Sequence, residues 1–506
     1  MSVQTGVDSK RVAKNTMVLY FRMIFQMVVY LYTSRVVIRE LGLEDYGIYD
    51  VVGAAIGILV FLNNSMLNCT QRFITFAIGK GDTVYLKSVF SVSVIIHLIL
   101  ALLILLLGET VGLWYVENRM IIPPARFDAA QWVYHCSLLS AVFVVMSVPY
   151  NSAIVAYEKM TAFAAITILD TLLKLAAVLS LSFVTGDKLK IYAMLLLGVA
   201  LIVRVVYGIY CKIAFKDLSF IWVKARALYK EMLGFAGWST FGNFALVCNT
   251  QGMNLLLNAF GGALLNAARG AAFQVQVAVT AFTASFQTAI NPQITKSYAV
   301  GDYSAMNGLV LRSSRFSFYL LLLIALPLAL EMPRVLSLWL GNVPPYAVVF
   351  TRLLLCVTLV DAVANSMMIG VSATGKIKKY HIVIGCTLLS ALPLAWVAVN
   401  VTGEPAMAFV AQLFAVFLAQ VIRLFFCRKL FGFSIMAFFK TVLLPISKVF
   451  VCAFVPSYIV HCYFNGSIVG FLLVVVATLL FTVLSVFLLG LAADERDFIF
   501  RKIHLR

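Results

Sequence analysis

Charged residues are scarce in this chain of 506 residues. Asp, Glu, Lys and Arg together make up 12% of the sequence, against roughly 25% in soluble proteins, whereas hydrophobic residues make up 62%. This scarcity excludes a soluble enzyme, a disordered chain and a small secreted domain built on disulfides. With only 12 prolines and 30 glycines, collagen-like and low-complexity sequences are excluded as well. The composition is that of an all-α integral membrane protein.

Cofactor motifs are also lacking. The nine cysteines form no C-x-x-C pair, and the five histidines show no ligand spacing. Neither a phosphate-binding Walker loop nor a glycine-rich dinucleotide motif occurs. We therefore expect no metal, no cofactor and no enzymatic activity. Because the chain is not expected to hydrolyse ATP, any process that it drives must take its energy from another source.

Long apolar runs of about 20 residues fill most of the sequence, the length that a helix needs to cross a bilayer. They predict fourteen membrane-spanning helices. The predicted spans are 15–37, 48–71, 88–108, 132–156, 163–185, 191–211, 232–257, 271–295, 316–333, 347–373, 381–401, 406–422, 441–463 and 467–491.

The Lys and Arg residues are distributed unequally between the two sides of the membrane that these spans define. Assigned to alternate sides of the membrane, 26 of the 39 Lys and Arg lie on the side of the termini and 8 on the other side. Because positive loops stay in the cytoplasm, both termini are predicted to be cytoplasmic. The formal charge of +18 therefore reflects topology and does not indicate a nucleic-acid partner.

An internal repeat relates the first six spans to the next six at an offset of about 214 to 220 residues. The matches are Gly42 with Gly262, Ser65 with Ser285, Ile74 with Ile294, Thr75 with Thr295, Gly81-Asp82 with Gly301-Asp302, Asn151-Ser152 with Asn365-Ser366, and Ile202-Val203-Arg204 with Val421-Ile422-Arg423. We expect two parallel six-helix lobes, 1–214 and 215–430, followed by an additional helix pair in 431–506. Such a repeat is typical of an alternating-access transporter.

Several short strings occur in order along the first eleven spans. They are Ser34-Arg35-Val36-Val37, Leu41-Gly42-x-x-Asp45-Tyr46-Gly47-Ile48-Tyr49, Thr70-Gln71-Arg72-Phe73, Gly79-Lys80-Gly81-Asp82, Val148-Pro149-Tyr150-Asn151, Phe235-Ala236-Gly237-Trp238, Asn266-Ala267-Ala268-Arg269-Gly270, Asn291-Pro292-Gln293 and Ala373-Thr374-Gly375-Lys376. On a fourteen-span frame, this series resembles the polysaccharide (O-antigen type) flippases of the multidrug, oligosaccharidyl-lipid and polysaccharide exporter superfamily.

The resemblance implies two lobes in a V shape in a bacterial inner membrane. It also implies transport of polyprenyl-diphosphate-linked oligosaccharide to the outer leaflet for O-antigen, lipopolysaccharide, capsule or exopolysaccharide synthesis. The implied partners are this lipid-linked cargo, membrane lipid, the polysaccharide synthesis machinery and a coupling proton or sodium ion. The last two helices carry no string of the family, so the resemblance leaves their role open.

Arginines inside the predicted spans are the first candidates for substrate binding, because a charge in the bilayer normally faces a cavity or a partner. Arg22 lies within the first span, and Gln26 follows one helical turn later on the same face. Either Arg22 extends to the cytoplasmic interface, or it binds an anion in a cavity. Arg35, at the other end of this span, is better explained by the interface or by pairing with an acid such as Glu40.

Arg269 opens the eighth span, where a guanidinium beside a helix N-terminus suits a diphosphate or a carboxylate. The resemblance adds Arg72, in Thr70-Gln71-Arg72-Phe73, to the candidates for substrate binding.

Acids within spans are candidates for coupling. Asp170 and Lys174 are four residues apart, a spacing that favours an ion pair within one helix. Asp361 has no such local partner, so it either pairs with Arg352 or titrates during transport. His97 is best explained as a hydrogen-bonded core residue.

Three functions compete. A flippase for lipid-linked glycan needs a cationic cavity, and the intramembrane arginines supply positive charge. A cation-coupled multidrug antiporter of the same superfamily would require an acid in the first span, which has Arg22 instead. A membrane enzyme would need a catalytic constellation or a sizeable loop domain, and the sequence offers neither. The flippase is the preferred interpretation.

Overall fold

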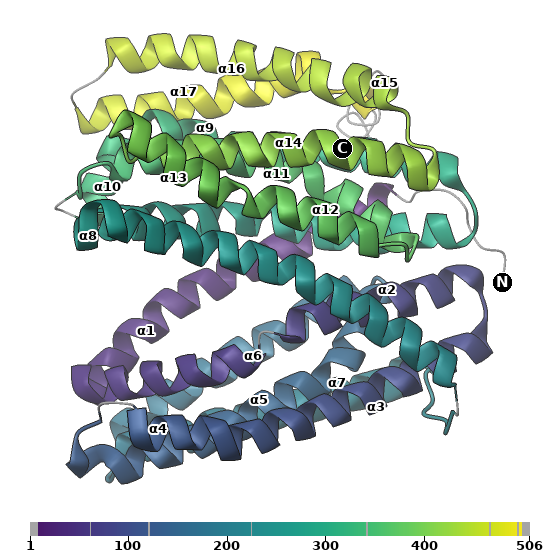
Figure 1. The fold of residues 1–506 in the computed structure, drawn as a ribbon, viewed down its shortest axis with the longest axis vertical. Coiled ribbons are helices and arrows are strands. Elements are labelled where there is room, and N and C mark those ends of the chain that lie inside the picture. The colour runs from purple at the N-terminus through teal and green to yellow at the C-terminus, as the bar shows by residue number, and fades with distance from the viewer. Residues whose placement is uncertain are drawn as a thin grey trace, which may run out of the picture. The chain divides into compact units, whose positions relative to one another are not determined.

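A computed structural model describes residues 9–60, 62–119, 122–223, 225–340, 343–464, 467–492 and 495–497, and these residues form helices and connecting loops with no β-strand among them (Figure 1). The contacts divide the chain into two compact units, Met1–Thr240 and Phe241–Arg506, here called the N unit and the C unit. The predicted all-α fold is confirmed.

The N unit consists of long helices joined by short connections. Its elements are α1 (Ser9–Val60), α2 (Leu62–Lys80), α3 (Thr83–Leu107) with a π-helical turn (Gly108–Gly112), α4 (Leu113–Arg119), a 3₁₀ turn (Pro124–Arg126), α5 (Phe127–Ala156), α6 (Met160–Ser180) with a 3₁₀ turn (Leu181–Phe183), and α7 (Lys188–Ala214).

The C unit also consists of long helices and ends in an additional helix pair. The elements are α8 (Arg226–Ala299), which crosses the boundary between the units, α9 (Tyr303–Leu330), α10 (Met332–Leu340), α11 (Ala347–Ala373), α12 (Lys378–Leu389), α13 (Ala391–Thr402), α14 (Met407–Phe431), α15 (Ile435–Phe438), a π-helical turn (Phe439–Leu443), α16 (Leu444–Tyr463), α17 (Ile468–Ser485) and a final π-helical turn (Val486–Gly490).

The two longest helices each contain more than one predicted span. Helix α1 breaks at Gly42, whose φ of 80° lies in the left-handed region that glycine adopts without steric cost. Helix α8 reverses direction between Thr250 and Arg269, as shown by the hydrogen bond from Arg269 Nη2 to the carbonyl of Thr250 at 2.6 Å. In a straight helix, these residues would lie about 28 Å apart.

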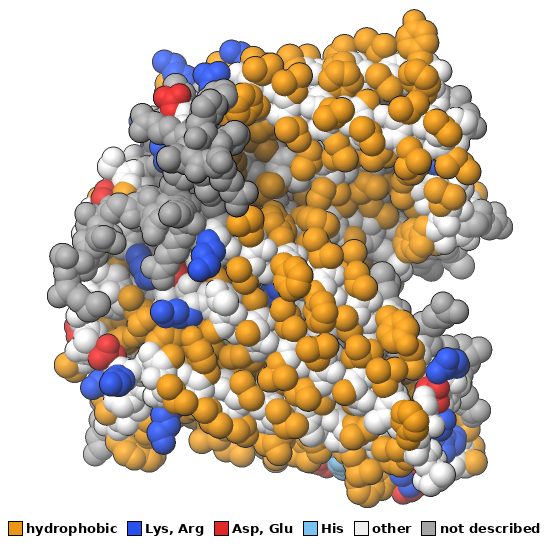
Figure 2. Space-filling model, turned by 180° about the vertical axis from the view of Figure 1, so that it is seen from behind, with side chains coloured by type: hydrophobic (Ala, Val, Ile, Leu, Met, Phe, Trp, Pro, Cys, Tyr) orange, Lys and Arg blue, Asp and Glu red, His pale blue; other side chains and the backbone are white. Residues whose placement is uncertain are grey.

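Ten helices in the described part of the chain are long and apolar enough to cross a membrane. They coincide with the predicted spans three to six and nine to fourteen, and the other four predicted spans lie in α1, α2 and α8. Hydrophobic side chains cover most of the middle of the face shown in Figure 2, whereas charged side chains gather toward its left and right edges. The chain is a multi-pass integral membrane protein.

The repeat recurs in the local structure. Gly81 and Gly301 both have positive φ, 69° and 81°. The side chain of Asp82 then caps α3 by accepting from Tyr85 N at 2.9 Å, and that of Asp302 caps α9 by accepting from the Ala305 amide at the same distance. The two Gly-Asp pairs therefore make the same helix-to-helix turn in each unit.

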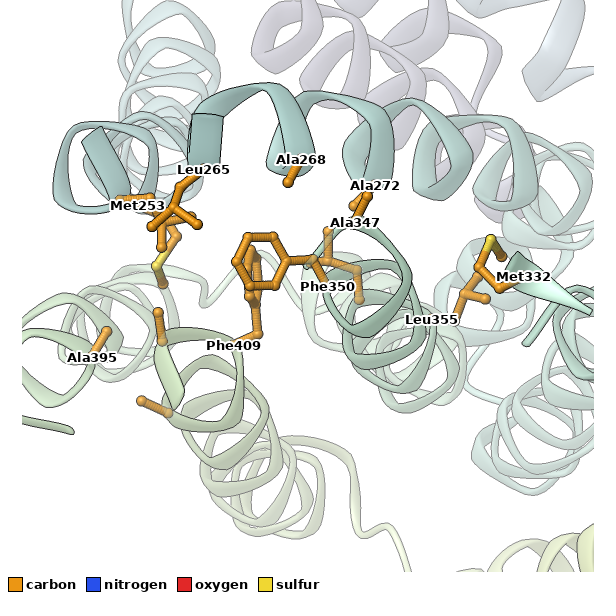
Figure 3. Packing of buried hydrophobic residues seen from close by; sticks show 14 of the residues in the cluster. Met253, Leu265, Ala268, Ala272, Met332, Ala347, Phe350, Leu355, Ala395 and Phe409 are labelled. Atoms are coloured by element: carbon orange, nitrogen blue, oxygen red, sulfur yellow. The ribbon is translucent and has the colours of Figure 1, made fainter. Parts of the chain in front are cut away.

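Each unit has its own apolar core. In the C unit, the rings of Phe350 on α11 and Phe409 on α14 lie 4.7 Å apart and are almost fully buried, with Ala268 and Ala272 of α8 beside them (Figure 3). In the N unit, α5 supplies much of the core, including Tyr134, whose hydroxyl donates to the Gly108 carbonyl at 2.6 Å. These cores hold the helices that carry the polar residues described below.

The additional pair, α16 and α17, is bound to α9 at both of its ends. At one end, Arg315 pairs with Glu495 at 2.6 Å, and Tyr319 donates to the Gly490 carbonyl at 3.2 Å. At the other end, His461 lies 2.7 Å from the carboxylate of Glu331. The pair is therefore fixed to the C unit by polar contacts as well as by packing.

Candidate functional site

A cavity of about 640 Å³ lies within the C unit, between α8, α11, α12 and α14, and is here called the C cavity. Asp361 of α11 and Arg423 of α14 both line it, and they interact electrostatically. Arg423 is held from two sides, because it donates to the Tyr380 hydroxyl at 2.8 Å and to Gln420 Oε1 at 2.7 Å. The cavity thus contains an acid and a fixed guanidinium from different helices.

Asp361 faces the C cavity without a direct partner: no hydrogen bond or ion pair reaches it from the residues that the structure describes. Of the two alternatives for Asp361, the pairing with Arg352 is not formed, because that guanidinium donates instead to the carbonyls of Ala329 and Leu330, at 2.8 and 3.3 Å. The physical reason is distance, since nine residues along a helix separate two side chains by about 13 Å.

Amide side chains form a second part of the C cavity. Asn365 lines it and donates to Gln287 Oε1, while its own Oδ1 has no partner among the described atoms. Gln276, on α8, donates to the Thr358 hydroxyl at 3.0 Å. Asn365 Oδ1 and the carboxylate of Asp361, which line the same cavity, can together accept hydrogen bonds from an ammonium-type cation, a hydronium ion or a hydroxylated ligand.

A second cavity, of about 610 Å³, lies within the N unit between α5, α6 and α7 and is here called the N cavity. Asp170 and Lys174 line it and form the expected ion pair, with an Nζ–Oδ2 distance of 2.8 Å. Tyr207 of α7 also lines this cavity and interacts electrostatically with Asp170.

The two candidates on α1 lie against α6. Arg22 stacks on the Phe163 ring, with its Cζ 4.8 Å from the ring centroid, and interacts electrostatically with Tyr207. Its Nε has no hydrogen-bond partner within the described residues. Gln26 donates to Thr171 Oγ1 at 3.1 Å and thereby joins α1 to α6. Arg22 is thus next to a residue of the N cavity without being one of its lining residues.

The remaining arginine candidates differ in environment. Arg269 is buried and lines a small hollow in the C unit, with its guanidinium 5.6 Å from the Phe273 centroid. Arg72 is surrounded by aromatic rings in the N unit and lies 4.0 Å from Glu231. The side chain of Arg35 lies outside the described part of the structure. His97 is buried with Nδ1 2.7 Å from the Ser93 carbonyl, which confirms the core interpretation.

Arg423 is the functional candidate that the sequence analysis missed. The charge count treated Arg423 as one of the basic residues on the cytoplasmic side. In the structure, Arg423 is only 6% exposed and lines the C cavity. The repeat offered a clue, because it aligns Arg423 with Arg204, which lies inside the sixth predicted span, 191–211. Arg204 Cζ lies 4.2 Å from the centroid of the Tyr150 ring.

Comparison with family models finds no match, and neither does comparison with curated proteins. Solved structures do match. A crystal structure of a mutant MATE protein has a TM-score of 0.74 and 15% identity, covering 86% of this chain and 98% of that one. An outward-facing multidrug resistance MATE family transporter of the MOP superfamily gives a TM-score of 0.72 and 14% identity, covering 87% of this chain and 100% of that one.

A third match is a MOP superfamily transporter from Pyrococcus furiosus, described as having a binding pocket of reversed polarity. Its TM-score is 0.69 at 15% identity, covering 85% of this chain and 98% of that one. At this level of identity, the agreement concerns the fold. The chain has the helical fold of the MATE transporters of the MOP superfamily.

Proposed function

We propose that this chain is a membrane transporter that opens its binding site alternately to the two sides of the membrane. The observation that carries the proposal is a cavity of more than 600 Å³, lined in part by ionisable residues, inside each of two helical units. Ionisable groups among membrane helices are costly unless they face a partner or a cavity, and they commonly mark a substrate or ion pathway. In this proposal, the predicted lobes 1–214 and 215–430 are the parts that move.

For the cargo, we propose a polyprenyl-diphosphate-linked oligosaccharide. Besides the resemblance, the charge of the helices supports this class. Arg22, Arg204 and Arg269 have no carboxylate partner within the described ranges, whereas the membrane acids Asp170 and Asp361 each have a cation nearby. An excess of guanidinium groups suits a diphosphate, which an arginine can bind through paired hydrogen bonds.

A cation-coupled multidrug exporter is the second candidate, and the structural neighbours support it better than they support the first. Two of the three structures described above are MATE proteins, one of them a multidrug resistance transporter. A drug cation would require an accessible carboxylate, and Asp361 offers one in the C cavity.

In either case, we propose Asp361 as the coupling residue. Arg423, Tyr380 and His381 line the same cavity. Protonation of the carboxylate would change its interaction with Arg423, and a proton or a sodium ion could drive that change. Asp170 is the weaker coupling candidate, because Lys174 already neutralises it.

Transport assays with the full chain in proteoliposomes distinguish the two cargo classes. We expect the full chain to move a labelled polyprenyl-diphosphate-linked oligosaccharide between leaflets. Replacing Arg22 with Ala should abolish this transport because the guanidinium is lost, whereas Arg22→Lys should retain part of it. Arg269→Ala should act in the same direction more weakly.

Arg39→Ala is the matched control, because this arginine is 71% exposed and pairs only with its neighbour Glu40 in the described structure. Transport of ethidium driven by an ion gradient, without movement of the glycolipid, would replace the first candidate with the second. Full glycolipid transport by Arg22→Ala would remove Arg22 from the binding site.

A further inference from the structure

The N cavity is bordered by two facing rows of polar side chains. On α5, Ser137, Ser140 and Ser147 lie at helical spacing on one face, and Asn151 follows one turn later. On α6, the facing row contains the Asp170–Lys174 pair. Helix α5 also carries much of the apolar core of the unit, including Val133, Tyr134 and Leu138.

The two rows offer both donors and acceptors. Ser140 and Ser147 donate to the carbonyls of Cys136 and Phe143, at 2.8 and 2.7 Å, so their oxygen lone pairs remain as acceptors. Ser137 and Asn151 make no hydrogen bond with any described residue, so the hydroxyl and the amide can each donate and accept.

The charge of the cavity restricts its ligand. Lys174 and Asp170 neutralise each other, so a ligand with a full charge is attracted by one and repelled by the other, and it can bind one of them alone only by separating the pair. Separation would leave one charge unpaired among membrane helices, which is unfavourable. A neutral ligand can instead bind the outer lone pairs of Asp170 and the two remaining protons of Lys174 without breaking the pair.

We propose that the N cavity is a binding site for a neutral sugar residue. A pyranose ring has hydroxyl groups that donate and accept along its edge and C–H groups on its faces, and Val144 and Ile166 supply apolar wall for those faces. A volume of about 610 Å³ lies within the roughly 300–1,000 Å³ that is usual for small-molecule sites. The inference rests on the lipid-linked oligosaccharide of the proposed function and assigns one of its sugars to this site.

The test is saturation-transfer NMR on the full chain in detergent micelles, with N-acetylglucosamine and methyl glucoside as probes. Glucuronate and tetramethylammonium serve as charged probes. We expect both neutral sugars to bind the native chain. The double variant Ser137→Val/Asn151→Leu should bind them about ten-fold more weakly, because two hydrogen-bonding groups are lost.

Asn400→Leu is the matched control, since Asn400 is exposed on α13 and donates only to the Trp396 carbonyl within the described region. It should bind the sugars like the native chain. If the double variant fails to fold, Val144→Phe narrows the cavity from a position that is itself exposed, and it should weaken sugar binding as well.

Absence of sugar binding would overturn the inference, as would native binding by folded variants or displacement of the sugar by tetramethylammonium. The outcome is separable from that of the transport assay. If the glycolipid moves equally well in the native chain and in the N cavity variants, the sugar site is wrong and the flippase stands. If sugar binds in the N cavity but glycolipid does not move, the flippase is wrong.

Discussion

Arg126 joins three parts of the N unit, and its replacement should measurably destabilise that unit. The guanidinium donates to Asp45, just beyond the break in α1, with Nε–Oδ1 at 2.8 Å. It also donates to Asp187, the N-cap of α7, at 3.0 Å through both Nη1 and Nη2. Arg126→Met would leave the two carboxylates close together with no cation between them.

The size of the expected loss of stability in Arg126→Met depends on how exposed the three charged side chains are. The side chains of Arg126, Asp45 and Asp187 are 27%, 19% and 28% exposed. Exposed pairs are worth about 0.2–1 kcal/mol, and removing one partner of a fully buried pair costs about 3–5 kcal/mol. Loss of these two partly solvated ion pairs should therefore lower the free energy of unfolding by about 1.5 kcal/mol, which corresponds to a fall of roughly 3–6 °C in Tm for a unit of this size.

The pH dependence provides a second signature. Partial burial acts to raise the pKa of the Asp187 carboxyl, but the hydrogen bonds from Arg126 and from backbone amides outweigh it and lower the pKa. Hydrogen bonds from Lys188 and Arg39 likewise lower the pKa of Glu40 to about 2. A carboxyl with a lowered pKa stabilises the fold above its unfolded pKa and loses that contribution as the pH falls through the folded value. Stability should therefore fall below about pH 4.5, less steeply in Arg126→Met.

The assay is thermal denaturation of the purified chain in detergent at pH 7 and at pH 4. Lys190→Met is the matched control, because its partner Asp128 is 75% exposed, and it should lower Tm by less than half as much. Equal losses in the two variants, or no loss in Arg126→Met, would refute the argument from the double pair.

Three further predictions concern packing, the last helices and topology. Gly108→Ala should lower Tm by several degrees, since a new Cβ would lie 2.5 Å from the buried Leu138 side chain, while Gly198→Ala, with nothing within 4 Å, should not. Glu331→Leu should make 441–491 more sensitive to protease, because it removes the partner of His461; native resistance would show that packing alone holds these helices. In a cysteine-free background, cysteines introduced at Lys188 and Arg226 should be labelled from outside and from the cytoplasm, respectively, and the reverse pattern would overturn the predicted orientation.

Features determined by nearby residues could be predicted from the sequence. The apolar runs located the helices because the length of a span is set by the bilayer. The Gly-Asp pairs could be aligned because both the positive φ and the helix cap are local properties. The Asp170–Lys174 pair followed from its four-residue spacing for the same reason.

Contacts between distant segments could not be predicted in this way. Asp361 and Arg423 lie on different helices, so no spacing relates them, and the nearer Arg352 was considered instead. The reversal of α8 and the two acids bound by Arg126 depend equally on tertiary packing. The charge count could not predict the burial of Arg423, because it used position along the chain, whereas burial depends on where the long side chain points.

The two units share the Gly-Asp turn, but the charges in their cavities differ. Arg204 and Arg423 occupy matching positions, but Arg423 has Asp361 nearby, whereas Arg204 packs on Tyr150 with no carboxylate partner in the described residues. The C cavity therefore contains a carboxylate, that of Asp361, to which a proton or a cation can bind. The N cavity has a neutral pair on one helix, and Arg22, which has no carboxylate partner among the described residues, is close to its lining residue Tyr207. In the proposed function, this difference is the physical reason to place coupling at Asp361 in the C unit.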